Sequence, residues 1–360
     1  MNLSKGRKHF IGLLIATVLL FIAKPMYDSG HGNSTAATDL YNFSGKTYVC
    51  GIDLGDDMKG GHGLETGLAY EIIKTFAQDH NCNISIKISR RRENLIDSLK
   101  QGKIDMLIVH HNDLETDEDI ILSENLTQCC AFALYHDKDN HIDEVNRWLE
   151  VYTQSEEFIK MQDLFTRPNN PVRLAERGVK RDTLCPYDEL LKRYAKDLGW
   201  DWRMLAAVVY QESKFSISSH SHRGATGLMQ VMPRTARYYH IHDLHDPEQN
   251  LLAGTSHLKR LQKLYRGSGM SQQERINFTL AAYNAGEGRI MDCRNLAKSQ
   301  NLDHNRWEDV VKVIPQMSQD SILVDENVRL GKFKGTETIS YVENVMNLYH
   351  AICKICPEHD

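Results

Sequence analysis

The spacing of apolar residues changes character part-way along the chain. In the first half, short β-rich runs at 46–54, 82–88 and 104–109 alternate with helical periods at 67–77 and 93–101. Strands that alternate with helices are typical of βαβ units. This half therefore predicts an α/β domain with a mostly parallel sheet.

From residue 187 onward the pattern contains only helical periods, separated by Gly, Pro and Asn signals. Six helices are predicted, at 187–198, 202–212, 247–264, 272–283, 306–313 and 337–355. A Pro/Asn-rich break at 167–171 favours a domain boundary. The sequence thus predicts an α+β chain of two domains. An α/β domain at 45–166 is followed by a linker at 167–181 and an all-α domain at 182–356.

Length and the N-terminus agree with an exported two-domain protein. The 360 residues exceed what one core usually supports. Lys5, Arg7 and Lys8 precede an uncharged apolar run at 10–23, which is the pattern of an export signal. The run is shorter than the roughly 20 residues of a membrane span, yet no clear cleavage site follows it. We expect residues 1–24 to be a signal peptide or a retained membrane anchor, residues 25–44 to be a linker, and the remainder to lie in the periplasm.

Charge and metal-binding side chains exclude several classes of partner. A net charge of −5 gives no general attraction to nucleic acid. Eight cysteines in an oxidising compartment permit disulfides, and we expect Cys185 to pair with Cys353 or Cys356. Cys353 and Cys356 have no second pair at zinc spacing, and the three histidines at 240, 242 and 245 lie in a connecting loop. No metal and no cofactor are predicted.

One acidic residue stands out in the helical half. At helical spacing, Glu212 shares a face with Leu205, Val208 and Val209. An acid on an apolar stripe is costly unless it is protonated, paired or functional. A solvated acid at a helix end is the ordinary alternative, so the interpretation of Glu212 depends on the other motifs in this half of the chain.

Four motifs lie in the helical half: Glu212-Ser213, Gly-Leu-Met-Gln at 227–230, Ala-Tyr-Asn-Ala-Gly at 282–286 and Glu-Thr-Ile-Ser-Tyr-Val at 337–342. Each alone could be a turn, a helix cap, a surface acid or a core aromatic. Together and in this order they resemble the soluble lytic transglycosylase domain, which is related to goose-type lysozyme. The match spans roughly 182–356.

The α/β half resembles bacterial solute-binding proteins of the amino-acid-binding type, in its strand order and in Gly-Leu-Ala-Tyr-Glu-Ile-Ile at 67–73. The second lobe of that family looks missing. The family's carboxylate-gripping arginine would fall at 115–120, where the charged residues are all acidic. We therefore expect a single lobe that does not bind amino acids. Its position makes a muropeptide a candidate ligand.

The two halves behind an N-terminal membrane segment resemble the membrane-bound lytic murein transglycosylase F type. The resemblance implies that Glu212 is the catalytic acid and base, and that eight residues contact the glycan: Ser213, Ser221, Met229, Gln230, Tyr283, Asn284, Glu337 and Tyr341. It places Ser221 near the N-acetyl group and the Tyr283 hydroxyl near Glu212. Ile339 stands where the family often has Arg, which weakens the last motif.

The expected chemistry follows from Glu212. Apolar surroundings raise the pKa of a Glu enough for it to protonate a glycosidic oxygen. A hydrolase pairs such an acid with a second carboxylate, but no acid lies three or four residues away on this helix. This absence fits the reaction that the resemblance implies, in which a lytic transglycosylase cleaves the MurNAc–GlcNAc β-1,4 bond of peptidoglycan and leaves a 1,6-anhydro end. A hydrolytic muramidase and a non-catalytic peptidoglycan-binding or sensing protein are the alternatives.

Overall fold

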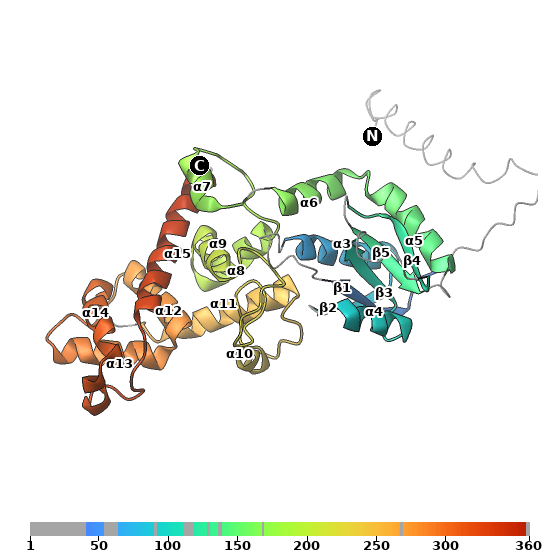
Figure 1. Ribbon diagram of the computed structural model, residues 1–360. Helices are drawn as coiled ribbons and strands as arrows, with labels where there is room; N and C mark the ends of the chain where they lie inside the picture. The colour runs from blue at the N-terminus through green and yellow to red at the C-terminus, as the bar shows by residue number, and fades with distance from the viewer. Residues whose placement is uncertain are drawn as a thin grey trace, which may run out of the picture. The chain divides into compact units, whose positions relative to one another are not determined.

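The computed structural model describes residues 41–53, 64–89, 92–110, 118–127, 130–135, 139–167, 169–266 and 269–357. The predicted signal or anchor, nearly all of the predicted linker at 25–44, and most of the acidic stretch at 113–119 lie outside these residues. Within them, no helix is long and apolar enough to cross a membrane. Figure 1 shows the described part as ribbons coloured by residue number.

A five-stranded sheet with the order β2-β1-β3-β5-β4 forms the core of the N-terminal part. Its strands are β1 (Thr47–Asp53), β2 (Asn83–Ser89), β3 (Met106–His110), β4 (Ile120–Asn125) and β5 (Cys130–Tyr135). β1 pairs in parallel with β2 and β3, whereas β5 pairs antiparallel with β3 and β4. The prediction of a mostly parallel sheet is therefore wrong for its second half. Only four residues separate β4 from β5, and a parallel pair needs a crossover of about a dozen.

Helices cover both faces of this sheet. On one face, α3 (Glu65–Asp79), α5 (Asp139–Tyr152) and α6 (Glu156–Thr166) bury the side chains of Ile52 and Ile108. On the other face, α4 (Arg92–Lys100) covers Leu107 and Val109. Alternate residues of β3 thus enter different cores, as the two-residue period of a strand requires. The described residues contain this one sheet, consistent with a single lobe.

The C-terminal part is helical. Its α-helices are α7 (Pro171–Glu176), α8 (Asp188–Leu198), α9 (Trp202–Ser213), α10 (Pro233–Tyr238), α11 (Pro247–Lys263), α12 (Gln272–Ala285), α13 (Glu287–Ser299), α14 (Trp307–Val313) and α15 (Thr336–Ile355), with 3-10 turns at Ile314–Ser318 and Asp320–Val324. All six predicted helices are confirmed. The α+β fold class is confirmed as well, because a small mixed sheet with helices precedes an all-helical part.

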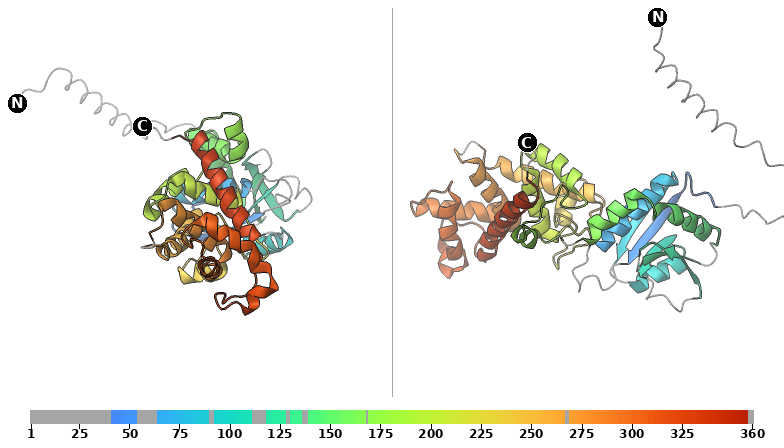
Figure 2. Two further views of the ribbon diagram at one scale, coloured as in Figure 1. Left: turned by 90° about the vertical axis from the view of Figure 1, so that its left-hand side faces the viewer. Right: turned by 90° about the horizontal axis from the view of Figure 1, so that it is seen from above.

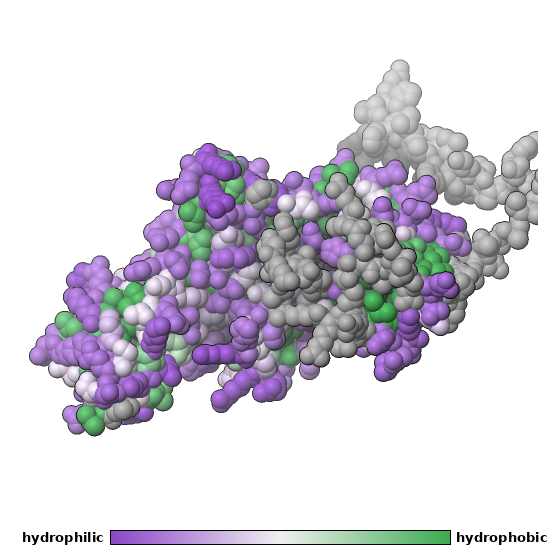
Figure 3. Space-filling model, in the orientation of Figure 1, coloured by the Kyte–Doolittle hydropathy of each residue, from purple (hydrophilic) through white to green (hydrophobic). Residues whose placement is uncertain are grey.

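Two helices organise the C-terminal part. α9 is buried along nearly its whole length from Arg203 to Tyr210. α15 packs along both α9 and α7, as Figures 1 and 2 show for the red helix. The face drawn in Figure 3 is mostly hydrophilic, with apolar residues in small separate patches, as is usual for a water-exposed surface.

The sheet part and the helical part touch through a few specific contacts. The Tyr70 hydroxyl of α3 donates to the Asp246 carboxylate at 2.9 Å, and Lys74 lies 3.9 Å from the same carboxylate. A side chain at Gly67 would collide with Phe165 and the Tyr187 hydroxyl. Residues Tyr41–Asp360 form one compact unit. The domain boundary between 166 and 182 stays a prediction.

The expected disulfide is not formed in this structure. Among the described residues, no disulfide joins Cys185 to Cys353 or Cys356. Cys185 is fully buried, and burial is the main reason that its pKa lies well above the ordinary value. Burial likewise raises the pKa of Cys356 to about 11. Both side chains are thus held as protonated thiols, the unreactive form in disulfide chemistry.

Candidate active site

Glu212 lies in the last turn of α9, where the helix stops abruptly. Asp201 caps the N-terminus of α9 by accepting a hydrogen bond from the Arg203 amide. At the other end, Lys214 and Phe215 both adopt left-handed backbone conformations, with φ of 57° and 67°. The chain therefore turns away directly after Ser213. This turn leaves the Glu212 side chain partly exposed at the end of an otherwise buried helix.

The pKa of the Glu212 carboxyl group lies near neutral pH. Burial raises its pKa from 4.5 to about 7, and the hydrogen bond from Tyr341 opposes that rise. The Tyr341 hydroxyl donates to Glu212 Oε1 at 2.6 Å. Among the described residues no carboxylate contributes to the shift. The apolar stripe predicted from the sequence is confirmed, because Leu205, Val208 and Val209 are fully buried.

The two tyrosines of the predicted site have different partners. Tyr341, on α15, makes the direct contact with Glu212. Tyr283, on α12, donates instead to the Met229 carbonyl at 2.8 Å. Burial and, after it, the charge of the nearby Glu212 raise the Tyr283 pKa. The hydrogen bond to Glu212 that was expected near Tyr283 is thus made by Tyr341.

The Gly-Leu-Met-Gln motif lies in the loop between α9 and α10. Gly227, with φ of +78°, sits where any side chain would collide with Asn250 and the Leu244 carbonyl. The Gln230 amide donates to the carbonyls of Ser219 and Gly227 at 3.0 and 3.1 Å. Gln230 itself is left-handed, with φ of 47°. Gly227 and Gln230 therefore hold the loop in its conformation.

Asn250 anchors this loop and was not singled out by the sequence. It is completely buried on α11. Its carbonyl accepts from the Met229 amide at 2.8 Å, and its amide donates to the Thr226 and Leu244 carbonyls at 2.9 and 2.8 Å. An Asn in the first turn of a helix is unremarkable in a sequence, so no local signal marked it.

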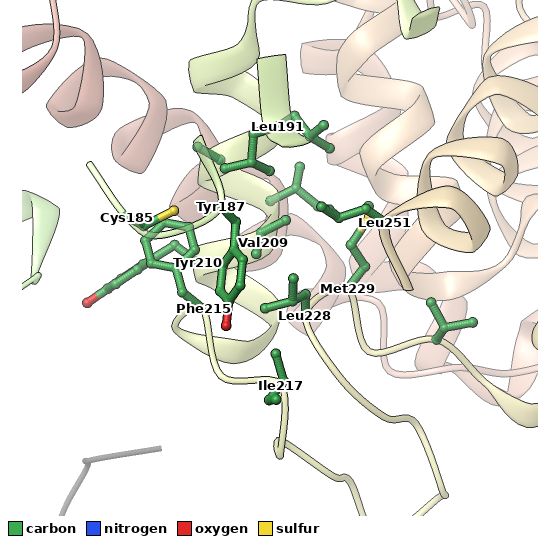
Figure 4. Close-up of a cluster of buried hydrophobic side chains, with 14 of the residues drawn as sticks. Cys185, Tyr187, Leu191, Val209, Tyr210, Phe215, Ile217, Leu228, Met229 and Leu251 are labelled. Carbon is green, nitrogen blue, oxygen red and sulfur yellow. The ribbon is translucent and has the colours of Figure 1, made fainter. Parts of the chain in front are cut away.

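The Met229 side chain belongs to the hydrophobic core. It is fully buried, and it lies against α11 so closely that a side chain at Gly254 would collide with its sulfur. Figure 4 shows Met229 turned toward Leu251 among the buried apolar residues. Its backbone carbonyl, bonded to Tyr283, is the part of Met229 that takes part in the polar network of the site.

The two predicted serines are engaged locally. Ser213 is buried and donates to the Val209 carbonyl at 3.1 Å, one turn back in α9. Ser221 accepts from the Ala225 amide at 3.0 Å and so closes the turn that holds Gly224. Ser221 is partly exposed, so its hydroxyl lies at the surface of the loop.

A surface hollow of about 360 Å³ lies between α9, α12 and α15. Its lining includes Tyr341, the hydrogen-bond partner of Glu212, and Gln211, the neighbour of Glu212 in the chain. Tyr341, Asn284 and Glu337 line it together with Gln211, Thr336, Ser340 and Asn344. The Thr338 hydroxyl donates to the Asn284 side chain at 2.9 Å and joins the two helices. Glu337 is exposed, 4.0 Å from Lys334. The structure therefore brings the third and fourth motifs together on one surface.

Metal-binding side chains do not gather near this hollow. Within the described ranges, no group of three His, Cys, Asp or Glu side chains could hold a metal ion. Of the three loop histidines, His245 places Nδ1 3.0 Å from the Ile217 carbonyl.

Comparison with known proteins finds a family model that matches this helical part. Residues 189–306 match the family model described as the transglycosylase SLT domain. This part of the chain is similar to the SLT domain. The matched segment carries Glu212, the loop with Gln230, and Tyr283. The SLT-like segment ends before α15, so Glu337 and Tyr341 lie outside the match.

Several relatives have the same printed name. The membrane-bound lytic murein transglycosylase F of Vibrio cholerae is 38% identical over 172 residues, covering 48% of this chain and 32% of that protein. Its namesake in Pseudomonas putida (strain W619) is 29% identical over 269 residues, covering 71% and 54%. The resemblance inferred from the motifs is confirmed. The chain spans about a third to a half of the length of these relatives.

Solved structures of lytic transglycosylases are also similar. The lytic transglycosylase Slt of Pseudomonas aeruginosa matches with 23% identity and a TM-score of 0.34, covering 58% of this chain and 29% of that one. The 70 kDa soluble lytic transglycosylase of Escherichia coli matches with 18% identity and a TM-score of 0.36, covering 82% and 44%.

Proposed function

We propose that the SLT-like part cleaves the MurNAc–GlcNAc β-1,4 bond of peptidoglycan strands as a lytic transglycosylase, with Glu212 as its acid and base. The main support is the state of this carboxyl group. Its pKa of about 7 keeps a large fraction protonated at neutral pH, as a proton donor to a glycosidic oxygen requires.

The proposed reaction needs only one carboxyl group. Glu212 gives its proton to the glycosidic oxygen as the bond from that oxygen to C1 of MurNAc breaks. The carbonyl oxygen of the sugar's own N-acetyl group bonds to C1 and shields the positive charge. The Glu212 carboxylate then takes the proton of the C6 hydroxyl, and O6 displaces the N-acetyl oxygen from C1. The product is a 1,6-anhydromuramoyl end, and no water is consumed.

Within the described residues, the absence of a carboxylate among the causes of the Glu212 pKa shift favours this route over hydrolysis. A paired catalytic carboxylate would raise the Glu212 pKa by its charge, but the described residues raise it through burial alone. The Tyr341 hydroxyl donates to Glu212 and stabilises the carboxylate formed after proton donation. A hydrolytic muramidase on the same fold is the second candidate, supported by the same acid.

Product analysis distinguishes these candidates. Purified peptidoglycan sacculi are digested with the full chain and the soluble fragments are examined by mass spectrometry. We expect anhydromuramoyl ends, lighter by one water than reducing ends. Glu212→Gln should lower the rate by at least about 10²-fold, in line with the loss of general acid catalysis. Glu343→Gln on the exposed side of α15 is the matched control.

Other outcomes separate the alternatives. Reducing muramic ends without anhydro products would replace the lytic reaction with hydrolysis. Unchanged cleavage by Glu212→Gln would remove Glu212 from the reaction. Binding to sacculi without cleavage by the parent chain would favour a peptidoglycan-binding protein.

The location and partners complete the proposal. We place the protein in the cell envelope, exported by its N-terminal segment, with that segment as a candidate membrane anchor. The relatives' name, membrane-bound lytic murein transglycosylase F, supports this location. The α/β part is proposed to regulate cleavage, with a muropeptide as its candidate ligand. Equal rates and equal muropeptide responses for the full chain and for residues 172–360 would contradict that role.

A further inference from the structure

A second and larger groove lies next to the hollow at Glu212. It has a volume of about 930 Å³ and runs between α7, the end of α9 and the C-terminal half of α15. Gln211 and Asn344 line both this groove and the hollow beside Glu212. A ligand chain seated in the hollow next to Tyr341, the partner of Glu212, can therefore continue into the groove without leaving the surface.

The lining of the groove is mainly basic at its rim. Arg173 of α7, Lys214 after α9 and Lys354 of α15 contribute three positive charges, against one negative charge from Glu176. Arg173, Lys214 and Lys354 are exposed, and the structure records no ion pair for them within its described ranges. Such side chains are available for an anionic ligand.

Their positions are fixed by the fold. The Lys214 ammonium lies 4.3 Å from the centre of the Tyr210 ring, a cation–π contact that holds it at the groove wall. Arg173 belongs to a helix capped by Asn170, whose side chain accepts from the Arg173 amide at 3.1 Å. Lys354 is in the last turn of α15, and its carbonyl accepts from Lys180 at 2.6 Å.

Apolar side chains form part of the groove lining. Leu348 and Ala351 of α15 lie one turn apart and are 6% and 8% exposed. Val172 of α7 is exposed at 42% and faces the same groove. Basic side chains beside apolar ones suit a ligand that combines carboxylates with methyl groups.

The length of the groove can be compared with such a ligand. From Asn344 to Lys354, α15 extends about 15 Å at 1.5 Å per residue. An extended peptide of four residues spans roughly 13 Å. Peptidoglycan carries short peptides on its muramoyl sugars, and these peptides contain alanine methyl groups and free carboxylates. The groove matches one such peptide in length, charge and polarity.

We propose that the groove between α7 and α15 binds the acidic stem peptide of the peptidoglycan strand whose sugars lie at Glu212. This inference rests on the proposed function for its substrate. Arg173 and Lys354 bind peptide carboxylates at opposite walls, and Leu348 and Ala351 contact the peptide methyl groups. The protein then prefers glycan strands that still carry their peptides over stripped ones.

The test compares two substrates. Soluble glycan strands with tetrapeptide stems, and the same strands stripped by an amidase, are cleaved by the full chain and by the double variant R173Q/K354Q. We expect KM for peptide-bearing strands to rise about tenfold in the variant, with kcat and stripped-strand cleavage changed less than twofold. The control is R177Q/K196Q, two exposed basic residues that do not line the groove.

Two outcomes of this comparison would contradict the proposal. An equal loss on both substrates would assign the groove to the sugars or to folding, and no loss on either would leave the groove without this role. The conservative variant Lys354→Arg, combined with native Arg173, should keep the preference for peptide-bearing strands.

Direct binding separates this inference from the proposed cleavage. The isolated tetrapeptide stem is titrated calorimetrically into the parent chain and into R173Q/K354Q. Binding by the parent and an affinity at least tenfold weaker in the variant would support the groove even if no strand were cleaved. No binding, or equal binding by both proteins, would overturn the proposal whatever the cleavage assay gave.

Discussion

At the scale of single residues, the protonation of Glu212 depends on two opposing influences. Burial on the apolar side of α9 favours the neutral acid, whereas the Tyr341 hydroxyl favours the carboxylate. The result, a pKa of about 7, lies near neutral pH. The position of α15 therefore sets the pH range of the proposed reaction.

Replacing Tyr341 with Phe should shift that range upward. Loss of the hydroxyl removes the influence that lowers the Glu212 pKa, so the pKa rises above about 7. Since the reaction requires the protonated acid, activity on sacculi should persist to a pH higher by up to about one unit, corresponding to about 1.4 kcal/mol. The measurement is the pH dependence of anhydro-product release.

Tyr349→Phe is the control for this variant. Tyr349 is also on α15 and donates to a carboxylate of the α9 region, but that carboxylate is Asp201 at the other end of the helix. Its loss should leave the alkaline limb in place. A downward shift with Tyr341→Phe, or the same shift with both variants, would contradict the assignment.

Sequence reasoning reached the acid but not its partner. Glu212 could be found because its apolar stripe repeats at helical spacing within one helix. The partner could not be chosen, because Tyr283 and Tyr341 lie 71 and 129 residues beyond Glu212 in the chain. Which hydroxyl reaches the carboxyl depends on how α12 and α15 pack, and a linear pattern does not contain that packing.

At the scale of elements, the loop between α9 and α10 is the least ordinary segment. It contains positive φ angles at Gly224, Gly227 and Gln230, and it has one buried anchor, Asn250. The three hydrogen bonds of the Asn250 side chain replace the regular structure that the loop lacks. Such a loop tolerates little change at the points where it meets α11.

Gly227→Ala should therefore destabilise the protein strongly. The methyl group would collide with Asn250 and the Leu244 carbonyl, so the free energy of unfolding should fall by at least about 3 kcal/mol, the range of the severe packing defects. Gly224→Ala is the matched control. It has a similar φ of +87°, but the nearest atom, Pro233 Cγ, is 3.7 Å from the added carbon.

The control should lose only the cost of a left-handed alanine, about 1 kcal/mol. Urea unfolding of both variants measures the difference. Equal losses would show that backbone strain alone matters and that the contact with Asn250 is unimportant.

Each element that the sequence patterns missed lacks a clear local signal. α10 and α7 are six residues long, too short to show a helical period. α13 follows α12 after the single residue Gly286, which marks a helix end without announcing a second helix. β4 combines an apolar start with the polar residues Ser123, Glu124 and Asn125, as edge strands do. Long periodic helices were predicted closely because their periodicity is strong.

At the scale of the whole molecule, the larger of the two hydrophobic cores runs from the sheet part into the helical part, while the smaller one stays under α4. Buried residues of the sheet and of the helical part belong to the same cluster, and the Tyr70–Asp246 hydrogen bond joins α3 to the N-cap of α11. Asp246 also accepts from the Gln249 amide at 2.8 Å. One carboxylate thus serves both the start of α11 and the contact with α3.

Tyr70→Phe should weaken this connection measurably. A hydrogen bond to a charged acceptor contributes about 1.5 kcal/mol, so the variant should melt a few degrees lower than the parent in one calorimetric transition. Tyr238→Phe, at a side chain 67% exposed, should leave the melting temperature unchanged. Two separate transitions, with only the lower one affected by Tyr70→Phe, would instead favour independently unfolding parts.

The contact between Glu212 and Tyr341 also has a consequence for the order of events during synthesis. The hydroxyl partner is 129 residues downstream of the acid, and ribosomes add about 5–20 residues per second. For roughly 6–26 seconds each new chain carries the acid without the helix that forms the opposite wall of its hollow. The proposed cleavage therefore depends on a residue that is added long after the acid, and a nascent chain that stops before α15 should lack it.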